Sequence, residues 1–376
     1  MIKRKRFFFV LLFSVVSSLF LLVQYFKRDD LSSPISSHNL LFDFLNSSTF
    51  IQPTPKRDVS YAFVALLKNR DNIAEYEFAQ KTVKCYCESR KIPYYLLVND
   101  EENVKGCAME DYMYQRHCIL ANFMNTTEHE WFVMLDADMG VINPDTSIDK
   151  FIPNNESIFL VLTNRVMNSE IMTGSYIVRN DPRGRDFLMM WAKSFEVYRD
   201  RFGSDNAAVH SAIVRRYLPK LESSLAKCEY WWKLTEQYCR LFLYEVCVRN
   251  LLDNFDIPGV QFLEKTYSYV RDGWLTGGKF SQHDFIFHNW KEKVKNNRAA
   301  FGWWDYQFTE DAFNNLSLCT SGEEAYQLWR YKPGFRVTVA ENRKSLDTWI
   351  KNTKKERDRQ AKLSQTFNVD SAVNCH

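Results

Sequence analysis

The stretch WFVMLDADMGVINP, residues 131–144, joins an apolar run to two closely spaced acids. Its first five residues have the composition of a buried strand, and Asp136 and Asp138 follow at the carboxyl end. Residues i and i+2 of a strand point the same way, so both carboxylates should face one spot. Two like charges held together are costly without a cation between them, and oxygen ligands suit Mg²⁺ or Mn²⁺. The pattern predicts a metal-bridged diphosphate site, with two solvated acids in a turn as the alternative.

Similar apolar runs alternate with helical segments on both sides of this stretch. We expect strands at 61–67, 92–98, 131–135, 158–163 and 176–179, and helices at 71–90, 109–124, 183–202 and 228–254. Strands separated by helices indicate an α/β fold whose mainly parallel sheet has helices on both faces. Ligands of such sheets bind at the carboxyl ends of the strands, which is where the two acids lie. The charged last residues, 341–376, predict an exposed helix and tail.

A second informative segment is the uncharged run at residues 7–26, FFFVLLFSVVSSLFLLVQYF. A helix of about 20 apolar residues can span a bilayer. Four consecutive cations precede the run and two follow it, which keeps the N-terminus cytoplasmic. We expect a cytoplasmic tip (1–6), an uncleaved signal anchor (7–26), a stem (27–58) and a lumenal domain (59–340). A cleaved signal peptide is the alternative for the anchor.

The charge balance divides at the membrane. The whole chain carries 49 Lys and Arg against 46 Asp and Glu, a formal charge of +3. Six of the cations and none of the acids lie in residues 1–28, so the remaining body is slightly acidic. Nucleic-acid binding needs a clustered positive surface, and this body does not supply the composition for one. A hydrophobic content of 45% excludes a disordered chain.

The cysteines and glycosylation sequons agree with an oxidising compartment. The chain has nine cysteines, and disulfides explain them better than zinc-finger spacing does. An odd count leaves at least one cysteine unpaired or in an intermolecular bond, which would allow a disulfide-linked homodimer. Asn-x-Ser/Thr sequons begin at Asn46, Asn125, Asn155 and Asn315.

The apolar strand, the Asp-x-Asp pair and the short apolar continuation resemble the signature of GT-A nucleotide-sugar transferases. MTGSYIVRND (172–181) resembles the strand that closes the donor pocket in retaining members. The resemblance places Gly174 and Ser175 where the backbone approaches the sugar, and Thr173 stands where many relatives have Asn. It also implies that Arg116, in YMYQRHCIL, lies near the donor; a solvated charge on a helix face is the alternative.

Two later segments extend the resemblance. GSDNAAVHSA (203–212) resembles a helix start near the transferred sugar, with Asp205 and Asn206 in catalytic positions. Asp205 would orient the sugar or stabilise an oxocarbenium-like centre, or it would serve as a helix N-cap. HDFIFHNWK (283–291) resembles the segment that supplies the third metal ligand, here His288, and it places Lys291 near the phosphates. A hydrogen-bonded core histidine is the alternative for His288.

The resemblance covers roughly residues 60–295 and is closest to the fungal Golgi galactosyl/mannosyltransferase family and a nematode group of uncharacterised relatives. It implies a GT-A fold, a type II Golgi membrane protein with a lumenal catalytic domain, and retention of anomeric configuration. It also implies a UDP- or GDP-hexose donor, Mn²⁺ or Mg²⁺, and a glycan or glycoconjugate acceptor. Trp303 and Trp304 could stack on acceptor sugars, although paired tryptophans more often pack in a core, as we expect for Trp231 and Trp232.

Two other functions are alternatives to that of a transferase. Asp-x-Asp also occurs in phosphatases that form an aspartyl-phosphate. There the pair follows the first strand, whereas here two strands precede it and Met139 and Gly140 come next. A lumenal protein that keeps the fold and binds a nucleotide or glycan without turnover is the stronger alternative.

Overall fold

The computed structural model describes residues 59–235 and 238–366. The predicted anchor (7–26), the predicted stem (27–58) and the sequon at Asn46 lie outside them. Among the described residues, no helix is both long and apolar enough to cross a membrane. The other three sequon asparagines are exposed, at Asn125, Asn155 and Asn315.

In the described part of the chain, six strands form the main sheet in the order β2-β1-β3-β6-β5-β7. Their bounds are β1 Tyr61–Leu67, β2 Tyr94–Val98, β3 Trp131–Asp136, β5 Leu160–Asn164, β6 Ile171–Arg179 and β7 Val260–Leu263. Strands β2, β1, β3, β5 and β7 run in one direction, as predicted, and β6 runs against both of its neighbours. The chain returns from β5 into β6 through a short hairpin, and a hairpin can join only antiparallel strands.

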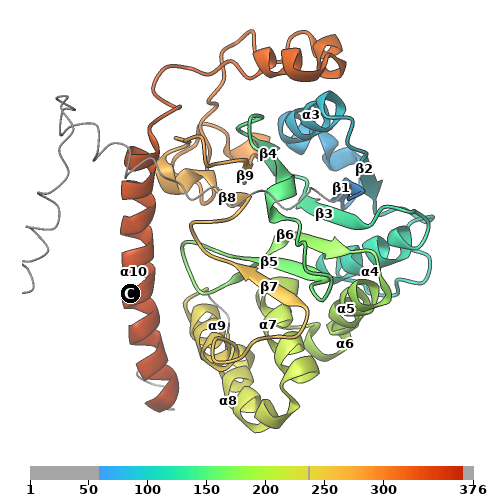
Figure 1. Cartoon of the computed structure of the whole chain (residues 1–376). Coiled ribbons are helices and arrows are strands. Elements are labelled where there is room, and N and C mark those ends of the chain that lie inside the picture. The colour runs from blue at the N-terminus through green and yellow to red at the C-terminus, as the bar shows by residue number, and fades with distance from the viewer. Residues whose placement is uncertain (1–58, 236–237, 367–376) are drawn as a thin grey trace, which may run out of the picture. The chain divides into compact units, whose positions relative to one another are not determined.

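Helices cover both faces of this sheet, which confirms the predicted layers (Figure 1). They are α3 Ile73–Ser89, α4 Tyr112–Met124, α5 Pro182–Lys193, α6 Phe195–Tyr198, α7 Ser204–Tyr217, α8 Glu222–Lys233, α9 Tyr238–Leu252 and α10 Val339–Thr366. The predicted helix at 183–202 is divided into α5 and α6 at Ser194, and the one at 228–254 into α8 and α9.

Successive side chains of β3 point to opposite faces of the sheet, so its one apolar run contributes to two hydrophobic cores. Phe132 and Met134 belong to the core beneath α4, α5 and α7. Trp131, Val133 and Leu135 belong to the opposite core, which α3 covers. A strand buried on both faces has no polar side, so its sequence reads as continuously apolar.

A small second sheet, β4-β9-β8, brings a distant part of the chain to the end of β3. Its strands are β4 Gly140–Val141, β8 Val270–Asp272 and β9 Ile286–His288. Gly140 pairs with Phe287, and the backbone N–H of Trp290 donates to the carbonyl of Asp138 at 2.8 Å. The pairing places the predicted third metal ligand, His288, beside the Asp-x-Asp turn.

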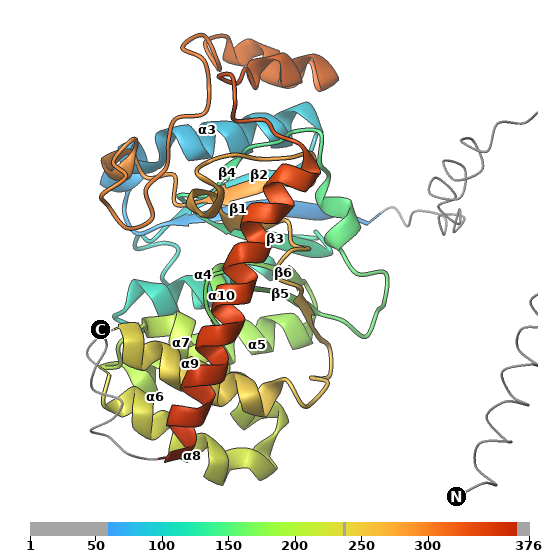
Figure 2. The same ribbon diagram turned by 90° about the vertical axis from the view of Figure 1, so that its left-hand side faces the viewer.

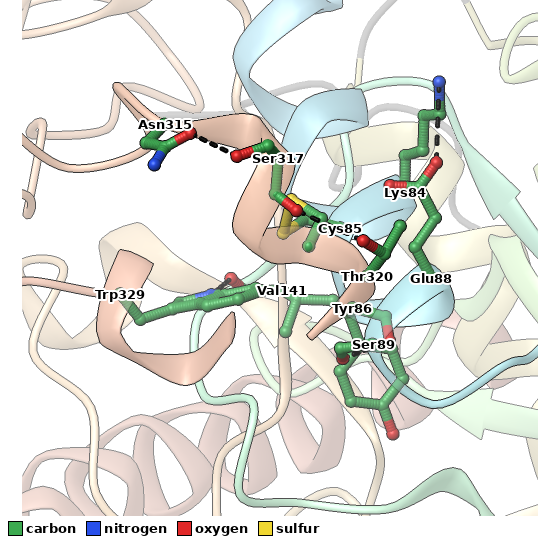
Figure 3. Close-up of a disulfide and its surroundings, with 11 residues drawn as sticks. Lys84, Cys85, Tyr86, Glu88, Ser89, Val141, Asn315, Ser317, Thr320 and Trp329 are labelled. Carbon is green, nitrogen blue, oxygen red and sulfur yellow. Dashed lines mark hydrogen bonds and ion pairs between the residues drawn. A yellow bond between two sulfur atoms is a disulfide. The ribbon is translucent and has the colours of Figure 1, made fainter. Parts of the chain in front are cut away.

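Disulfides are present, as predicted. Within the described residues they join Cys85 to Cys319, Cys107 to Cys118 and Cys228 to Cys247. The first ties α3 to the short helix η6, Leu316–Thr320 (Figure 3). Nearby, Trp329 donates its indole N–H to the carbonyl of Val141 at 2.8 Å. Cys87 remains a free, buried thiol.

The charged C-terminal segment forms the predicted helix, α10, which runs along one side of the molecule (Figure 2). Most of its described side chains are exposed. Polar contacts along its length join it to the body: Trp349 donates to the carbonyl of Leu275, Thr353 to the carbonyl of Val166, and Arg357 to Asp253.

Candidate functional site

The three predicted metal ligands converge at the carboxyl end of β3. Asp136 ends the strand, Asp138 follows within a tight turn, and His288 ends β9. One ligand atom from each residue can be chosen so that all three atoms lie within 4.8 Å of one another. Asp138 is 3% exposed, and its Oδ1 has no hydrogen-bond partner among the described residues. A buried carboxylate oxygen without a donor is costly unless a cation or another donor satisfies it.

The orientation of His288 is set by Asp272, which ends β8 directly opposite it. His288 Nδ1 lies 2.9 Å from Asp272 Oδ1, and its Nε2 lies 3.5 Å from Asp138 Oδ1. When Nδ1–H donates to the carboxylate, Nε2 keeps the lone pair that a metal needs. A hydrogen-bonded core histidine would make the same contact with Asp272, and the position of Nε2 beside Asp138 is the feature that a metal site requires in addition.

Asp272 is itself held by a fork from Arg165, whose Nε and Nη2 each donate to it at 2.9 Å. Burial alone would raise the pKa of Asp272, but Arg165 and His288 hold it far below its ordinary value. Neither Arg165 nor Asp272 was predicted from the sequence. The only signal for Asp272 was one acid at the end of a three-residue strand, and this pattern is too common to indicate a site.

Lys291, which the resemblance places near the phosphates, supplies a cation next to Asp138. Its Nζ lies 3.1 Å from Asp138 Oδ2, and its side chain is 32% exposed, so it can reach toward a ligand. Burial raises the pKa of Asp138, but His288 and Lys291 together outweigh burial and leave it below the ordinary value. The charge of Asp138 in turn raises the pKa of Lys291. Asp138 is therefore ionised and Lys291 protonated at neutral pH.

Arg116 lies beneath the site and bridges two acids. It is 2% exposed, donates to Asp136 Oδ1, and donates to Asp205 Oδ2 at 2.6 Å. The alternative of a solvated helix-face charge is wrong, because this side of α4 packs under the sheet against α5 and α7. Burial and the charge of Asp138 raise the pKa of Asp136 although Arg116 opposes them. The two acids of the pair therefore have opposite pKa shifts.

Asp205 is fully buried behind Arg116 and also accepts from His117 Nε2 at 3.0 Å. The His117 ring stacks on Trp191 with their centroids 3.7 Å apart. The N-cap alternative is wrong, because Gly203 is the N-cap of α7 and Asp205 lies inside the helix without a capping bond. Its carboxylate has no exposed surface, so Asp205 can influence the site only through its partners.

The remaining predicted donor residues lie on or beside β6. A Cβ built on Gly174 would lie 2.4 Å from Asp136 Oδ2, so β6 passes directly against that carboxylate. Ser175 follows Gly174 on β6, but its buried hydroxyl points into the core, where it donates to the carbonyl of Met134 and forms a hydrogen bond with the hydroxyl of Tyr269. Asn206 Oδ1 accepts from the backbone N–H and the hydroxyl of Thr173, which ties α7 to this strand.

The tryptophans divide between core and surface. Trp304 is 1% exposed and stacks on Trp290, so the idea that it stacks on an acceptor sugar is wrong. Trp303 is half-buried beneath the guanidinium of Arg298, 5.1 Å from its ring centroid. Trp231 and Trp232 are core residues, as expected.

A family model described as "Protein of unknown function, DUF273" matches residues 83–301. The match spans more than half of the chain and contains Asp136, Asp138, His288 and Lys291. The chain belongs to the DUF273 family. No curated protein matches this DUF273 chain in sequence.

Several solved structures similar to this DUF273 protein are glycosyltransferases. A glycosyltransferase involved in glycosylation of the major capsid of PBCV-1 is 14% identical, with a TM-score of 0.37 over 61% of this chain and 93% of that one. GlyE of Streptococcus pneumoniae TIGR4 is 14% identical, with a TM-score of 0.30 over 40% and 43% of the two chains. A Drosophila beta-1,4-galactosyltransferase 7 mutant, in complex with manganese, UDP-Gal and xylobiose, is 10% identical, with a TM-score of 0.23 over 35% and 52%. Likenesses this distant carry no argument about activity.

Proposed function

We propose that this DUF273 protein is a metal-dependent glycosyltransferase that moves a hexose from a UDP- or GDP-sugar to a glycan or glycoconjugate, with retention of configuration. The observation that carries the proposal is the meeting of Asp136, Asp138 and His288 at the carboxyl ends of the strands, next to Lys291. A nucleotide- or glycan-binding protein without turnover is the second candidate, because the same groups would hold a nucleotide without reacting.

The donor set fits a hard divalent cation. Two carboxylates and one imidazole are ligands that Mn²⁺ accepts, and Mg²⁺ accepts the oxygens. The unpartnered Oδ1 of Asp138 and the free Nε2 of His288 are the atoms available to bind it. When bound, such an ion neutralises charge that develops on a departing diphosphate.

The protein residues around this position have separate roles in the proposal. Lys291 adds a second positive charge for a phosphate oxygen. Asp272 holds the His288 ring so that Nε2 points at Asp138. Arg116 fixes the position of Asp136. Gly174 allows β6 to approach that carboxylate without a side chain between them.

Asp205 and Asn206 enter the proposal as positioning residues, in place of direct catalytic contacts. Asp205 holds the guanidinium of Arg116 from behind, and Asn206 anchors β6 through Thr173. Loss of the Asp205 or the Asn206 side chain would move the carboxylate pair without removing a group that touches the substrate. Ser175 contributes through its backbone position, since its hydroxyl points into the core.

The proposal includes a type II Golgi membrane protein with the anchor at 7–26. The buried disulfides and the three exposed sequons support folding in an oxidising compartment. A disulfide-linked homodimer is part of the same proposal. Non-reducing electrophoresis of the protein from detergent-solubilised membranes tests it.

The function is tested by binding and turnover together. Calorimetry of the wild-type protein with Mn²⁺ and UDP or GDP should show metal-dependent nucleotide binding, and Asp138→Asn should abolish it. Asp145→Asn, an exposed acid paired with Arg336, is the matched control and should bind normally. Unchanged nucleotide affinity in Asp138→Asn would refute the metal bridge. Metal-dependent binding without hydrolysis of any UDP- or GDP-hexose would favour the second candidate.

A further inference from the structure

A cavity of about 970 Å³ lies between β7, α9 and α10. Its lining contains Arg249 from α9, Lys265 after β7, and Arg357 from α10. None of the predicted metal or donor residues lines it. The volume falls in the range that binds small organic ligands.

Arg249 is a buried cation in the lining of this cavity. The residue is 7% exposed, and its Nη2 lies 2.7 Å from Asp253 Oδ1. Its other terminal nitrogen, Nη1, has no hydrogen-bond partner among the described residues. A buried guanidinium N–H without an acceptor costs free energy, so an acceptor from a ligand would be strongly favoured here.

Two further cations line the same cavity, Arg357 and Lys265. Arg357 Nη2 donates to Asp253 Oδ2 at 2.7 Å, so Arg249 and Arg357 share one carboxylate. Lys265 donates to the backbone carbonyls of Arg165 and Asn168. Burial, and then the charges of Arg249 and Arg357, lower the pKa of Lys265 to about 8. Arg249 and Arg357 are therefore charged N–H donors of the cavity, and the exposed Asp253 is the acid that they share.

Four further acids line the cavity, so an excess of positive charge does not distinguish it, whereas the unpartnered Nη1 of Arg249 does. Asp256 and Glu264 are exposed at the rim, where water solvates them. Asp347 pairs with Arg343 at 3.0 Å on the outer surface of α10. Glu170 is buried but already accepts from Arg165 at 3.2 Å.

We propose that this cavity binds a small ligand through one anionic group, a carboxylate, sulfate or phosphate monoester. Arg249 and Arg357 supply the charged N–H donors, and Lys265 adds a third positive charge. A guanidinium binds each of these groups through two parallel hydrogen bonds. The site is separate from the metal centre, and the inference does not rest on the proposed function.

The test uses calorimetry on the full-length protein in the presence of a metal chelator, with three charged probes and one neutral probe. Glucuronic acid, glucose 6-sulfate and glucose 6-phosphate distinguish the three anionic groups, and glucose reports binding without a charge. We expect at least one charged probe to bind and glucose to bind at least tenfold more weakly. Failure of all three charged probes, or equal binding of glucose, overturns the proposal.

Variants place the binding in this cavity. Arg249→Met and Arg357→Gln should each lower the affinity of the bound probe at least tenfold, whereas Asp138→Asn at the metal centre should not change it. Arg357 is 29% exposed, so its variant keeps the test available if Arg249→Met does not fold. Arg330→Gln, an exposed arginine elsewhere on the surface, is the matched control. Loss of binding in Asp138→Asn, or unchanged binding in both cavity variants, overturns the proposal.

Discussion

Replacing Gly174 with alanine is the sharpest test of the geometry around the carboxylate pair. The new Cβ would lie 2.4 Å from Asp136 Oδ2 and 3.0 Å from its Cγ. The carboxylate cannot simply turn away, because Arg116 holds its other oxygen. We therefore expect Gly174→Ala to displace Asp136 while leaving Asp138 and His288 in place.

The size of the effect follows from the contact distances. Ordinary Cβ contacts begin at 3.4 Å, so the oxygen at 2.4 Å must retreat by about 1 Å. A displacement of that size at a reacting centre costs roughly 10²-fold in rate, which corresponds to about 2.7 kcal/mol. The backbone effect on stability is opposite in sign, since alanine in a strand is favoured over glycine by roughly 0.5–1 kcal/mol. Gly174→Ala should thus lose function and keep most of its stability.

The assay compares Gly174→Ala with its neighbour Ser175→Ala. Electron paramagnetic resonance of free Mn²⁺ in the presence of UDP or GDP gives metal affinity, donor hydrolysis gives turnover, and thermal unfolding gives stability. Ser175→Ala removes two buried hydrogen bonds and should lower stability by about 1–3 kcal/mol without changing Mn²⁺ affinity. Turnover and Mn²⁺ affinity within twofold of wild type in a folded Gly174→Ala protein would refute the reasoning.

Three further predictions concern the support of the site and the fold. Asp272→Asn should lower Mn²⁺ affinity by roughly 10–100-fold with little change in fold, because the His288 imidazole loses the carboxylate that orients it. An affinity equal to that of the wild-type protein in the same resonance titration would contradict this. Replacing Cys85 and Cys319 by serine opens a loop of 234 residues and should lower the free energy of unfolding by up to about 5 kcal/mol. Denaturant unfolding measures this loss, and an unchanged midpoint would mean that the disulfide adds no stability. Burial lowers the pKa of His210 from 6.5 to about 3, so the unfolded chain binds a proton there that the folded chain does not. This histidine alone should lower stability by about 2 kcal/mol between pH 7 and pH 5. The pH dependence of thermal unfolding should flatten in His210→Gln and stay unchanged in the exposed control His283→Gln; identical profiles for both would exclude this histidine.

The position of Asp136 and Asp138 at the carboxyl end of β3 was predicted from the sequence, because the decisive signals there are local. An apolar run followed by two acids marks the carboxyl end of a buried strand whatever the rest of the chain does. His288 was reached differently, through the resemblance of residues 283–291 to the GT-A segment that supplies a third metal ligand. The antiparallel direction of β6 was not predicted, because a strand buried on both faces has the same composition in either direction.

The support of the site could not be predicted, since it depends on partners distant in sequence. Whether Arg116 is solvated or buried is decided by Asp205, 89 residues away. Whether Asp205 caps a helix is decided by where α7 begins, and Gly203 takes that position. Asp272 acquires its role only when β8 pairs with β9.

The free thiol of Cys87 has a consequence for how the protein survives denaturation. In the folded chain the thiol is fully buried and burial raises its pKa, so it is unreactive. Unfolding removes both protections, and Cys87 then lies two residues from Cys85 in the bond to Cys319. Thiolate exchange can transfer that bond to Cys87 and close the long loop in the wrong register. Recovery of the native protein therefore depends on the acidity of the solution in which it was unfolded: acid preserves the correct pairing, and alkali scrambles it.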